Sequence, residues 1–249
     1  MSALAEKNAA RWARAHLTRN AAPVAQRLVA AKARYQAVAA KTGVPWFVIA
    51  VIHQRESSQN WRGSLAQGDP WDRVSVHVPR GRGPFKSWEE AAIDALTKCA
   101  PFLARRKDWS LGGTLEALEE YNGVGYAKRG IPSPYVWAGT DQYASGKYVS
   151  DGRFDPSHVD QQLGCAALIL AMMTIDHTIA FGNVVLTPST EKPKPKTSIV
   201  RNTTGSGTAG GAAATAAHQS GLSIGWVIGI GVAIFVASFL IIHFWRRKP

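Results

Sequence analysis

The chain has 249 residues, 46% of them hydrophobic and 18% charged, which is enough for one sizeable globular core with appended segments. This composition excludes a disordered, a collagen-like and a disulfide-framework protein. The formal net charge is +12, but residues 42–190 carry 14 basic against 15 acidic groups, whereas residues 1–41 carry eight basic groups and one acidic group. Because the basic excess lies near the ends and the central part is nearly neutral, we expect no nucleic-acid partner.

The first 22 residues are rich in alanine and arginine and have the pattern of an amphipathic helix. Leu4, Trp12 and Leu17 lie on one face, opposite several arginines. Two interpretations are open. Residues 1–22 are either a basic arm that binds anionic lipid or lipopolysaccharide, or a packing helix whose basic face is solvated.

A helical domain is predicted over residues 23–186. Its first helix begins at Pro23, where apolar side chains start to recur at three- and four-residue spacing, and it stops at Thr42-Gly43. The next helix begins at Pro45 and is apolar on almost every face until it reaches Glu56. This second pattern predicts a helix that is buried on most of its surface.

Glu56 stands at the far end of that apolar helix. Ile52, Ile49 and Val48 precede it by four, seven and eight residues, so they share its face. We therefore expect the carboxyl to emerge from an apolar environment at the mouth of a cleft, where desolvation raises its pKa. A carboxylic acid of this kind can protonate the oxygen of a glycosidic bond. The alternative is a glutamate that pairs with a nearby arginine such as Arg55 at the end of the helix.

A small β-hairpin is predicted in the glycine- and proline-rich segment that follows, residues 63–85. Hydrophobic and polar residues alternate from Val74 to Val78, as in a strand with one buried face. The hairpin would carry Asp69 or Asp72 near its first turn, where a carboxylate can assist the reaction. An Asp-Pro pair is also ordinary turn chemistry, and both interpretations stay open.

Three further helices are predicted in the domain. The first follows a capping box at residues 87–90 and runs through Leu96, the second runs from about Leu115 to Tyr121, and the third runs from about Pro156 to Ile179. Aromatic side chains gather around glycines after the second helix. Such rings suit a sugar cleft because they stack on the apolar faces of pyranoses, although each can equally pack in the core. They are Tyr121, Tyr126, Tyr135 and Trp137.

The C-terminal part has the composition of a tethered membrane anchor. Residues 187–221 are rich first in proline and lysine and then in glycine and alanine, which predicts a flexible linker. Residues 222–244 are apolar almost throughout and long enough to cross a bilayer, and residues 245–249 form a basic tail. A weak dimer through the membrane helix is a hypothesis that rests on three glycines at four-residue spacing, Gly221, Gly225 and Gly229.

No cofactor and no metal are expected. His53 and Glu56 form an H-x-x-E pair, but no further ligand stands at metal spacing. Cys99 and Cys165 lie in apolar helical contexts, which are more typical of small buried thiols than of a disulfide.

Three blocks of sequence, taken in order, resemble the phage and prophage lysozyme (endolysin) family, which is similar to goose-type lysozymes and soluble lytic transglycosylases. The blocks are Glu56-Ser57 at the end of a buried helix, Gly68-Asp69-Pro70, and the Y-N-G-x-G-Y turn at residues 121–126. The resemblance covers roughly residues 23–180.

The resemblance implies a mainly helical, α+β lysozyme-like fold with a small β-hairpin beside the cleft. It also implies an enzyme that cleaves peptidoglycan between N-acetylmuramic acid and N-acetylglucosamine. By position, Glu56 matches the general acid, Asp69 is the candidate second carboxylate, and Ser75 falls where a hydroxyl can orient water. The substrate-binding residues expected from the resemblance and from the aromatic pattern are Tyr121, Asn122, Gly123, Tyr126 and Tyr135.

Two aspects of the expected function stay open. The reaction is either hydrolysis or the anhydro-forming reaction of a lytic transglycosylase, and a non-catalytic membrane-tethered wall-binding protein is the alternative from another class. We expect a single-pass protein of the bacterial inner membrane. The side of its head is open, because the basic tail favours a cytoplasmic C-terminus whereas residues 1–20 lack the apolar stretch of a signal peptide.

Overall fold

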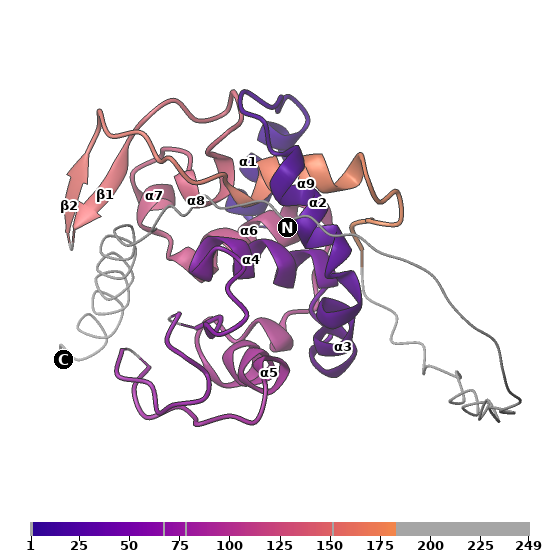
Figure 1. The fold of residues 1–249 in the computed structure, drawn as a ribbon. Coiled ribbons are helices and arrows are strands. Elements are labelled where there is room, and N and C mark those ends of the chain that lie inside the picture. Colours follow the sequence, from indigo (N-terminus) through magenta and orange to yellow (C-terminus); the bar gives the residue numbers. More distant parts are fainter. Residues whose placement is uncertain (1, 67, 78, 151, 183–249) are drawn as a thin grey trace, which may run out of the picture. The chain divides into compact units, whose positions relative to one another are not determined.

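The structure, a computed structural model, describes residues 2–66, 68–77, 79–150 and 152–182. Within these ranges the chain is mainly helical, with one small antiparallel sheet of two strands (Figure 1). The predicted linker, membrane helix, basic tail and glycine-mediated dimer all lie outside the described residues. The elements in chain order are α1 (Ala3–Trp12), α2 (Ala22–Ala30), α3 (Lys32–Thr42), α4 (Trp46–Ser57), α5 (Trp88–Lys98), the 3-10 helix η1 (Leu103–Arg105), α6 (Leu111–Asn122), α7 (Gly125–Lys128), α8 (Pro134–Trp137), β1 (Lys147–Ser150), β2 (Arg153–Asp155) and α9 (Cys165–Met173).

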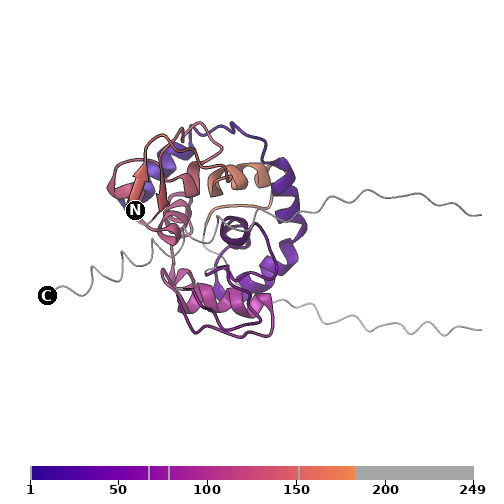
Figure 2. The same ribbon diagram turned by 60° about the vertical axis from the view of Figure 1, so that its left-hand side comes forward.

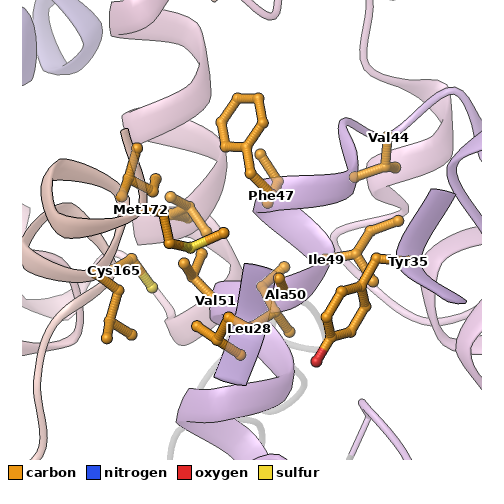
Figure 3. Close-up of a cluster of buried hydrophobic side chains, with 14 of the residues drawn as sticks. Leu28, Tyr35, Val44, Phe47, Ile49, Ala50, Val51, Cys165 and Met172 are labelled. Atoms are coloured by element: carbon orange, nitrogen blue, oxygen red, sulfur yellow. The ribbon is translucent and has the colours of Figure 1, made fainter. Parts of the chain in front are cut away.

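Helix α4 is the centre of the core, as its apolar sequence predicted. Every residue from Phe47 to His53 is buried, and the helix contacts α2, α3, α6 and α9 (Figures 1 and 2). Burial of so many apolar side chains on all faces is the main contribution to the stability of this helix. Figure 3 shows the cluster around α4, which includes side chains from α2, α3 and α9, namely Leu28, Tyr35, Cys165 and Met172. Both cysteines are free and buried.

The segment before α4 is two helices rather than the single predicted one. Pro23 lies in the first turn of α2 and Gly43 ends α3 with a φ of 72°, as expected, but the helix is interrupted at Ala31. Helix α2 packs on α9, whereas α3 packs on α4 and α5, so the two pieces face different partners. Among the described residues, no single helix is long and apolar enough to cross a membrane. Taken together, α3 and α4 have the length and the apolar composition of a membrane span, but the two helices are bent by 112° relative to each other.

Helix α1 packs against α6 and does not form a separate arm. Ala5 and Asn8 are buried in this contact. The Asn8 side-chain amide donates to the Glu119 carboxylate at 2.9 Å and accepts from the Trp137 indole at 3.4 Å. The expected boundary after residue 22 is therefore wrong, because α1 contributes to the interior of the helical unit, and its basic residues are the outer face of a packing helix.

We expect Asn8→Ala to lower the free energy of unfolding by about 1–3 kcal/mol, because the buried carboxyl of Glu119 loses its amide partner. Denaturant unfolding of the full chain checks this value. Gln36→Ala, on the exposed face of α3, is the control and should change stability little. Equal effects of the two substitutions would contradict the docking of α1 on α6.

The hairpin predicted in residues 63–85 is wrong, because the described residues of that segment contain no strand and only one isolated bridge, between Gly63 and Pro70. Ser75 exchanges backbone hydrogen bonds with Arg82 and Gly81, but three N–H groups bind side chains instead: the Asp69 carboxylate accepts from the N–H of Val76 and of His77, and the Ser75 hydroxyl accepts from Arg82 N–H. A backbone N–H used in this way is not available to a strand ladder. The sheet of the protein lies elsewhere, in β1 and β2, where Tyr148 pairs with Phe154.

The last predicted helix begins later than expected. Asp155 starts a turn and not a helix: its carboxylate accepts from the N–H groups of Ser157 and His158, as at the start of a helix, but no helix follows. Residues 156–164 then run without regular structure, and α9 occupies only Cys165–Met173. The irregular stretch has a structural use, since it carries Asp160 into the interior.

Candidate functional site

Glu56 lies in the last turn of α4, one residue before the helix ends at Ser57. One of its carboxylate oxygens, Oε1, accepts a hydrogen bond of 2.7 Å from the Tyr135 hydroxyl. Burial raises the pKa of Glu56 to about 8, although the Tyr135 hydrogen bond and the Arg55 charge both act to lower it. The carboxyl therefore holds its proton at neutral pH, as its position on the apolar face predicted.

No ion pair joins Glu56 to any of the described residues, so the alternative of a salt-bridged helix end is wrong. The two arginines nearest in sequence have other partners: Arg55 pairs with Asp160, and Arg62 pairs with Asp72, both at 2.9 Å. A carboxyl that is buried without a cation is favoured in its neutral form. This is the electrostatic condition that a general acid requires.

Two tyrosines complete the surroundings of Glu56. Tyr135 comes from α8 and Tyr121 from α6, where the Tyr121 hydroxyl donates to the backbone carbonyl of Leu65 at 2.8 Å. The pKa of each phenol is raised well above its usual value, first by burial and then by the nearby Glu56 carboxylate. Both phenols therefore stay protonated as donors. The structure thus brings together three of the residues singled out in the sequence, from three different helices.

Arg55 belongs to a buried ionic group that sequence reasoning did not find. The Arg55 side chain is 6% exposed and Asp160 is 1% exposed, and Asp160 also accepts from Lys147 at 2.9 Å. The Arg55 guanidinium lies 4.8 Å from the centre of the Tyr135 ring. Burial alone would raise the pKa of Asp160, but the two cations hold it below its usual value. No local pattern signals this group, because Arg55 and Asp160 are 105 residues apart.

Asp69 and Ser75 hold the loop that follows α4. The Asp69 carboxylate binds two backbone N–H groups and the His77 ring, and the Ser75 hydroxyl donates to the Pro79 carbonyl. The loop passes close to α4, because a Cβ atom on Gly68 would lie 3.5 Å from the Glu56 carbonyl oxygen. Asp69 therefore sits in a segment beside the site, while its oxygens fix the shape of the turn.

Tyr126, Asn122 and Gly123 lie at the end of α6 and after it. Tyr126 is buried, its hydroxyl accepts from Tyr148 N–H at 3.1 Å, and its ring packs edge-on against Tyr148. It thus anchors the β1–β2 sheet to α7. Asn122 is the last residue of α6, and Gly123 ends that helix with a φ of 98°, which favours glycine. Asn122 is partly exposed and so accessible to a ligand.

Both ring nitrogens of His53 form hydrogen bonds. Nδ1 accepts from the Tyr35 hydroxyl and Nε2 donates to the Asn60 carbonyl, each at 3.0 Å. Burial lowers the pKa of His53 to about 4, so the ring is neutral. This network holds the turn at Ser58 and Gln59, two residues that both have positive φ. The turn follows the end of α4 and therefore lies close to Glu56 in the sequence. In the described part of the chain, no group of three or more His, Cys, Asp and Glu side chains is placed to hold a metal ion.

Comparison of the chain with protein-family models, with curated proteins and with solved structures finds no match. The geometry around Glu56 and the motifs of the sequence are therefore the basis for a function.

Proposed function

We propose that the protein is a peptidoglycan-degrading muramidase of the endolysin type, in which Glu56 is the general acid. The observation that carries the proposal is a half-buried carboxyl without a cation partner at the end of an apolar helix, which desolvation keeps protonated at neutral pH. The order of the three sequence blocks supports the same substrate, the bond between N-acetylmuramic acid and N-acetylglucosamine. Peptidoglycan glycan strands are the proposed partner.

In the proposed reaction, Glu56 gives its proton to the glycosidic oxygen as the bond from that oxygen to the anomeric carbon breaks. The Tyr135 hydroxyl, 2.7 Å from Oε1, donates to the carboxylate that results and so stabilises it. The anomeric carbon, which carries positive charge, then takes a nucleophile. When the nucleophile is water, its proton passes to the Glu56 carboxylate and restores the acid.

A lytic transglycosylase is the second candidate, and the positions of Asp69 and Asp72 favour it. A hydrolase of the inverting type needs a second carboxylate to activate water. Asp69 already binds backbone N–H groups, and Asp72 pairs with Arg62 at the surface. In the alternative reaction, the C6 hydroxyl of the muramic acid residue closes on the anomeric carbon. Its proton passes to the Glu56 carboxylate, and the product is an anhydro sugar.

Digestion of purified peptidoglycan by the full chain in detergent, followed by mass spectrometry of the released muropeptides, tests the proposal. Cleavage with a new reducing end supports the muramidase, and an anhydro end supports the transglycosylase. Binding to peptidoglycan without any cleavage contradicts both and favours a non-catalytic wall-binding protein.

The pH dependence of cleavage gives a further prediction. Because the acid form of Glu56 is required and its pKa is about 8, we expect kcat/KM to fall by a factor of about ten per pH unit above that value. Initial rates on dye-labelled peptidoglycan between about pH 6 and about pH 10, roughly two pH units either side of the expected midpoint, measure this limb. Glu6→Gln, which removes an exposed carboxyl of α1, should leave the limb in place. A decline that begins near pH 5 would mean that Glu56 ionises like a surface carboxyl.

We further propose that residues 222–244 anchor the protein in the bacterial inner membrane, with the helical unit attached through residues 187–221. The proposal rests on the apolar length of the segment and on its basic tail. The basic outer face of α1 is the proposed contact with anionic lipid or lipopolysaccharide.

A further inference from the structure

The group formed by Arg55, Asp160 and Lys147 has no part in the reaction as derived above, yet it is buried next to the proposed acid. Arg55 precedes Glu56 in α4, Asp160 lies in the irregular segment before α9, and Lys147 opens β1. Buried charges are costly unless they are paired, and a paired buried charge is often retained for what it does to its surroundings. The position of this group beside Glu56 shows what it can affect.

Arg55 is held in one place by several contacts. One terminal nitrogen donates to Asp160 at 2.9 Å and the other donates to the Leu163 carbonyl at 3.3 Å. The guanidinium lies against the ring of Tyr135, whose hydroxyl binds Glu56. The Nε atom of Arg55 is buried and has no hydrogen-bond partner among the described residues. Asp160 is therefore the anion that balances the Arg55 charge.

Asp160 is itself fixed from both sides. Its second oxygen accepts from Lys147 Nζ at 2.9 Å and from Gln162 N–H at 3.2 Å, and its own N–H donates to the Tyr143 hydroxyl. Lys147 is 17% exposed and can turn its ammonium toward water, whereas Arg55 is enclosed. Without Asp160, the enclosed cation would find its nearest anion in Glu56.

We propose that Asp160 is a positioning residue for Glu56: it holds the Arg55 guanidinium against Tyr135 and balances its charge, so that Glu56 stays without a cation and keeps its proton. The catalytic consequence rests on the proposed function of Glu56, whereas the effect on its protonation does not. Asp160 thus sets the pH range over which the site can donate a proton.

The other ionisable groups around Glu56 do not take this role. The groups that act on Glu56, or on which its charge acts, are Arg55 of α4, Tyr121 of α6, Tyr135 of α8 and Cys165 of α9. Burial keeps the two phenols and the thiol neutral, since it raises the pKa of each. Arg55 is therefore the charge that matters, and Asp160 controls it.

The test is a titration of Glu56 without substrate. The full chain, labelled with ¹³C at the glutamate carboxyls and held in detergent, is followed by NMR, and Glu56→Gln identifies the signal. We expect Asp160→Asn to lower the pKa of Glu56 by about one unit or more, because the Arg55 charge is then uncompensated. Tyr143→Phe, which disturbs the same loop without changing its charge, is the matched control and should leave the pKa in place.

A double variant separates this role from a purely structural one. In Arg55→Gln/Asp160→Asn both charges are gone, so we expect the Glu56 pKa to equal or exceed that of the unmodified chain. General damage to the fold would instead change the single and double variants in the same direction. The proposal is overturned when Asp160→Asn leaves the pKa unchanged, or when the double variant lowers it as much as the single one.

A further variant is titrated if Asp160→Asn does not fold. Lys147→Met leaves Asp160 to Arg55 alone, and we then expect the Glu56 pKa to rise; an unchanged or lower value overturns the proposal. Because none of these titrations uses peptidoglycan, a failure of the proposed enzyme activity leaves them interpretable. In an active enzyme, the upper limb of the pH–rate profile should move with the pKa.

Discussion

Glu56→Gln is expected to reduce cleavage of peptidoglycan by a factor of about 10²–10⁴, the usual contribution of a general acid, and to leave the fold intact. The glutamine oxygen can still accept from the Tyr135 hydroxyl, which binds Oε1 in the unmodified chain. What is lost is the proton for the glycosidic oxygen. Release of soluble muropeptides by the two full chains, compared at equal concentration, measures the effect.

Stability measurements keep this result from being mistaken for misfolding. The pKa of Glu56 is raised in the folded state, so the native protein binds a proton more tightly than the unfolded chain does. The stability gained from that proton is present at low pH and is lost as the pH rises toward about 8. The glutamine of the variant never ionises. Glu56→Gln should therefore be as stable as the unmodified chain at about pH 4, below the pKa of Glu56 in both the unfolded and the folded state. At about pH 9, above both pKa values, the variant should be the more stable protein.

The control for activity is Glu6→Gln, which should digest peptidoglycan at the unmodified rate. Full activity of Glu56→Gln would remove Glu56 from the reaction and with it the proposed function.

Helix α4 and its glutamate were predictable because the signals for them are local. Pro45 marks the start of the helix, the apolar run from Trp46 requires burial, and the four-residue spacing back from Glu56 places the carboxyl on the apolar face. The direction of the pKa shift follows from the desolvation that this placement brings. Tyr121 and Tyr135 were also predictable as aromatic residues of the site, and the structure places both near Glu56, although each could equally have been a core residue.

The rest of the site depends on contacts between distant residues, which a single sequence does not reveal. The segment around Val74 has the alternation of a strand, but the Asp69 carboxylate takes the backbone N–H groups that a strand would need. The segment after Asp155 has the start signal of a helix, but Asp160 pairs with Arg55 in the interior, and the segment stays irregular as far as α9. In both cases one buried or half-buried carboxylate overrides the local pattern.

The site is assembled by helices whose backbones approach closely, and α8 is the most constrained of them. It has only four residues, so its own hydrogen bonds fix it weakly. It is held at the start of α9, where the N–H of Gly164, the residue before that helix, donates to the Ala138 carbonyl at 2.7 Å. The position of the Tyr135 hydroxyl on Glu56 therefore depends on how closely α9 can approach α8.

Gly164→Ala is expected to break this approach. A Cβ atom at Gly164 would lie 2.5 Å from the Val136 carbonyl oxygen and 2.7 Å from Ala138 N, both of them backbone atoms that cannot rotate away. Relief requires α8 to move by about 1 Å, which should lower the free energy of unfolding by about 1–3 kcal/mol. The same movement carries Tyr135 away from Glu56 and should reduce cleavage by a factor on the order of 10².

Urea unfolding and peptidoglycan digestion, measured on the same preparation, check both effects of Gly164→Ala. Gln162→Ala is the matched control, because Gln162 lies in the same segment, its side chain is exposed, and its backbone N–H, which donates to Asp160, is kept. The control should keep both stability and activity. If Gly164→Ala also kept both stability and activity, the close approach of α9 to α8 would not set the position of the Tyr135 hydroxyl on Glu56.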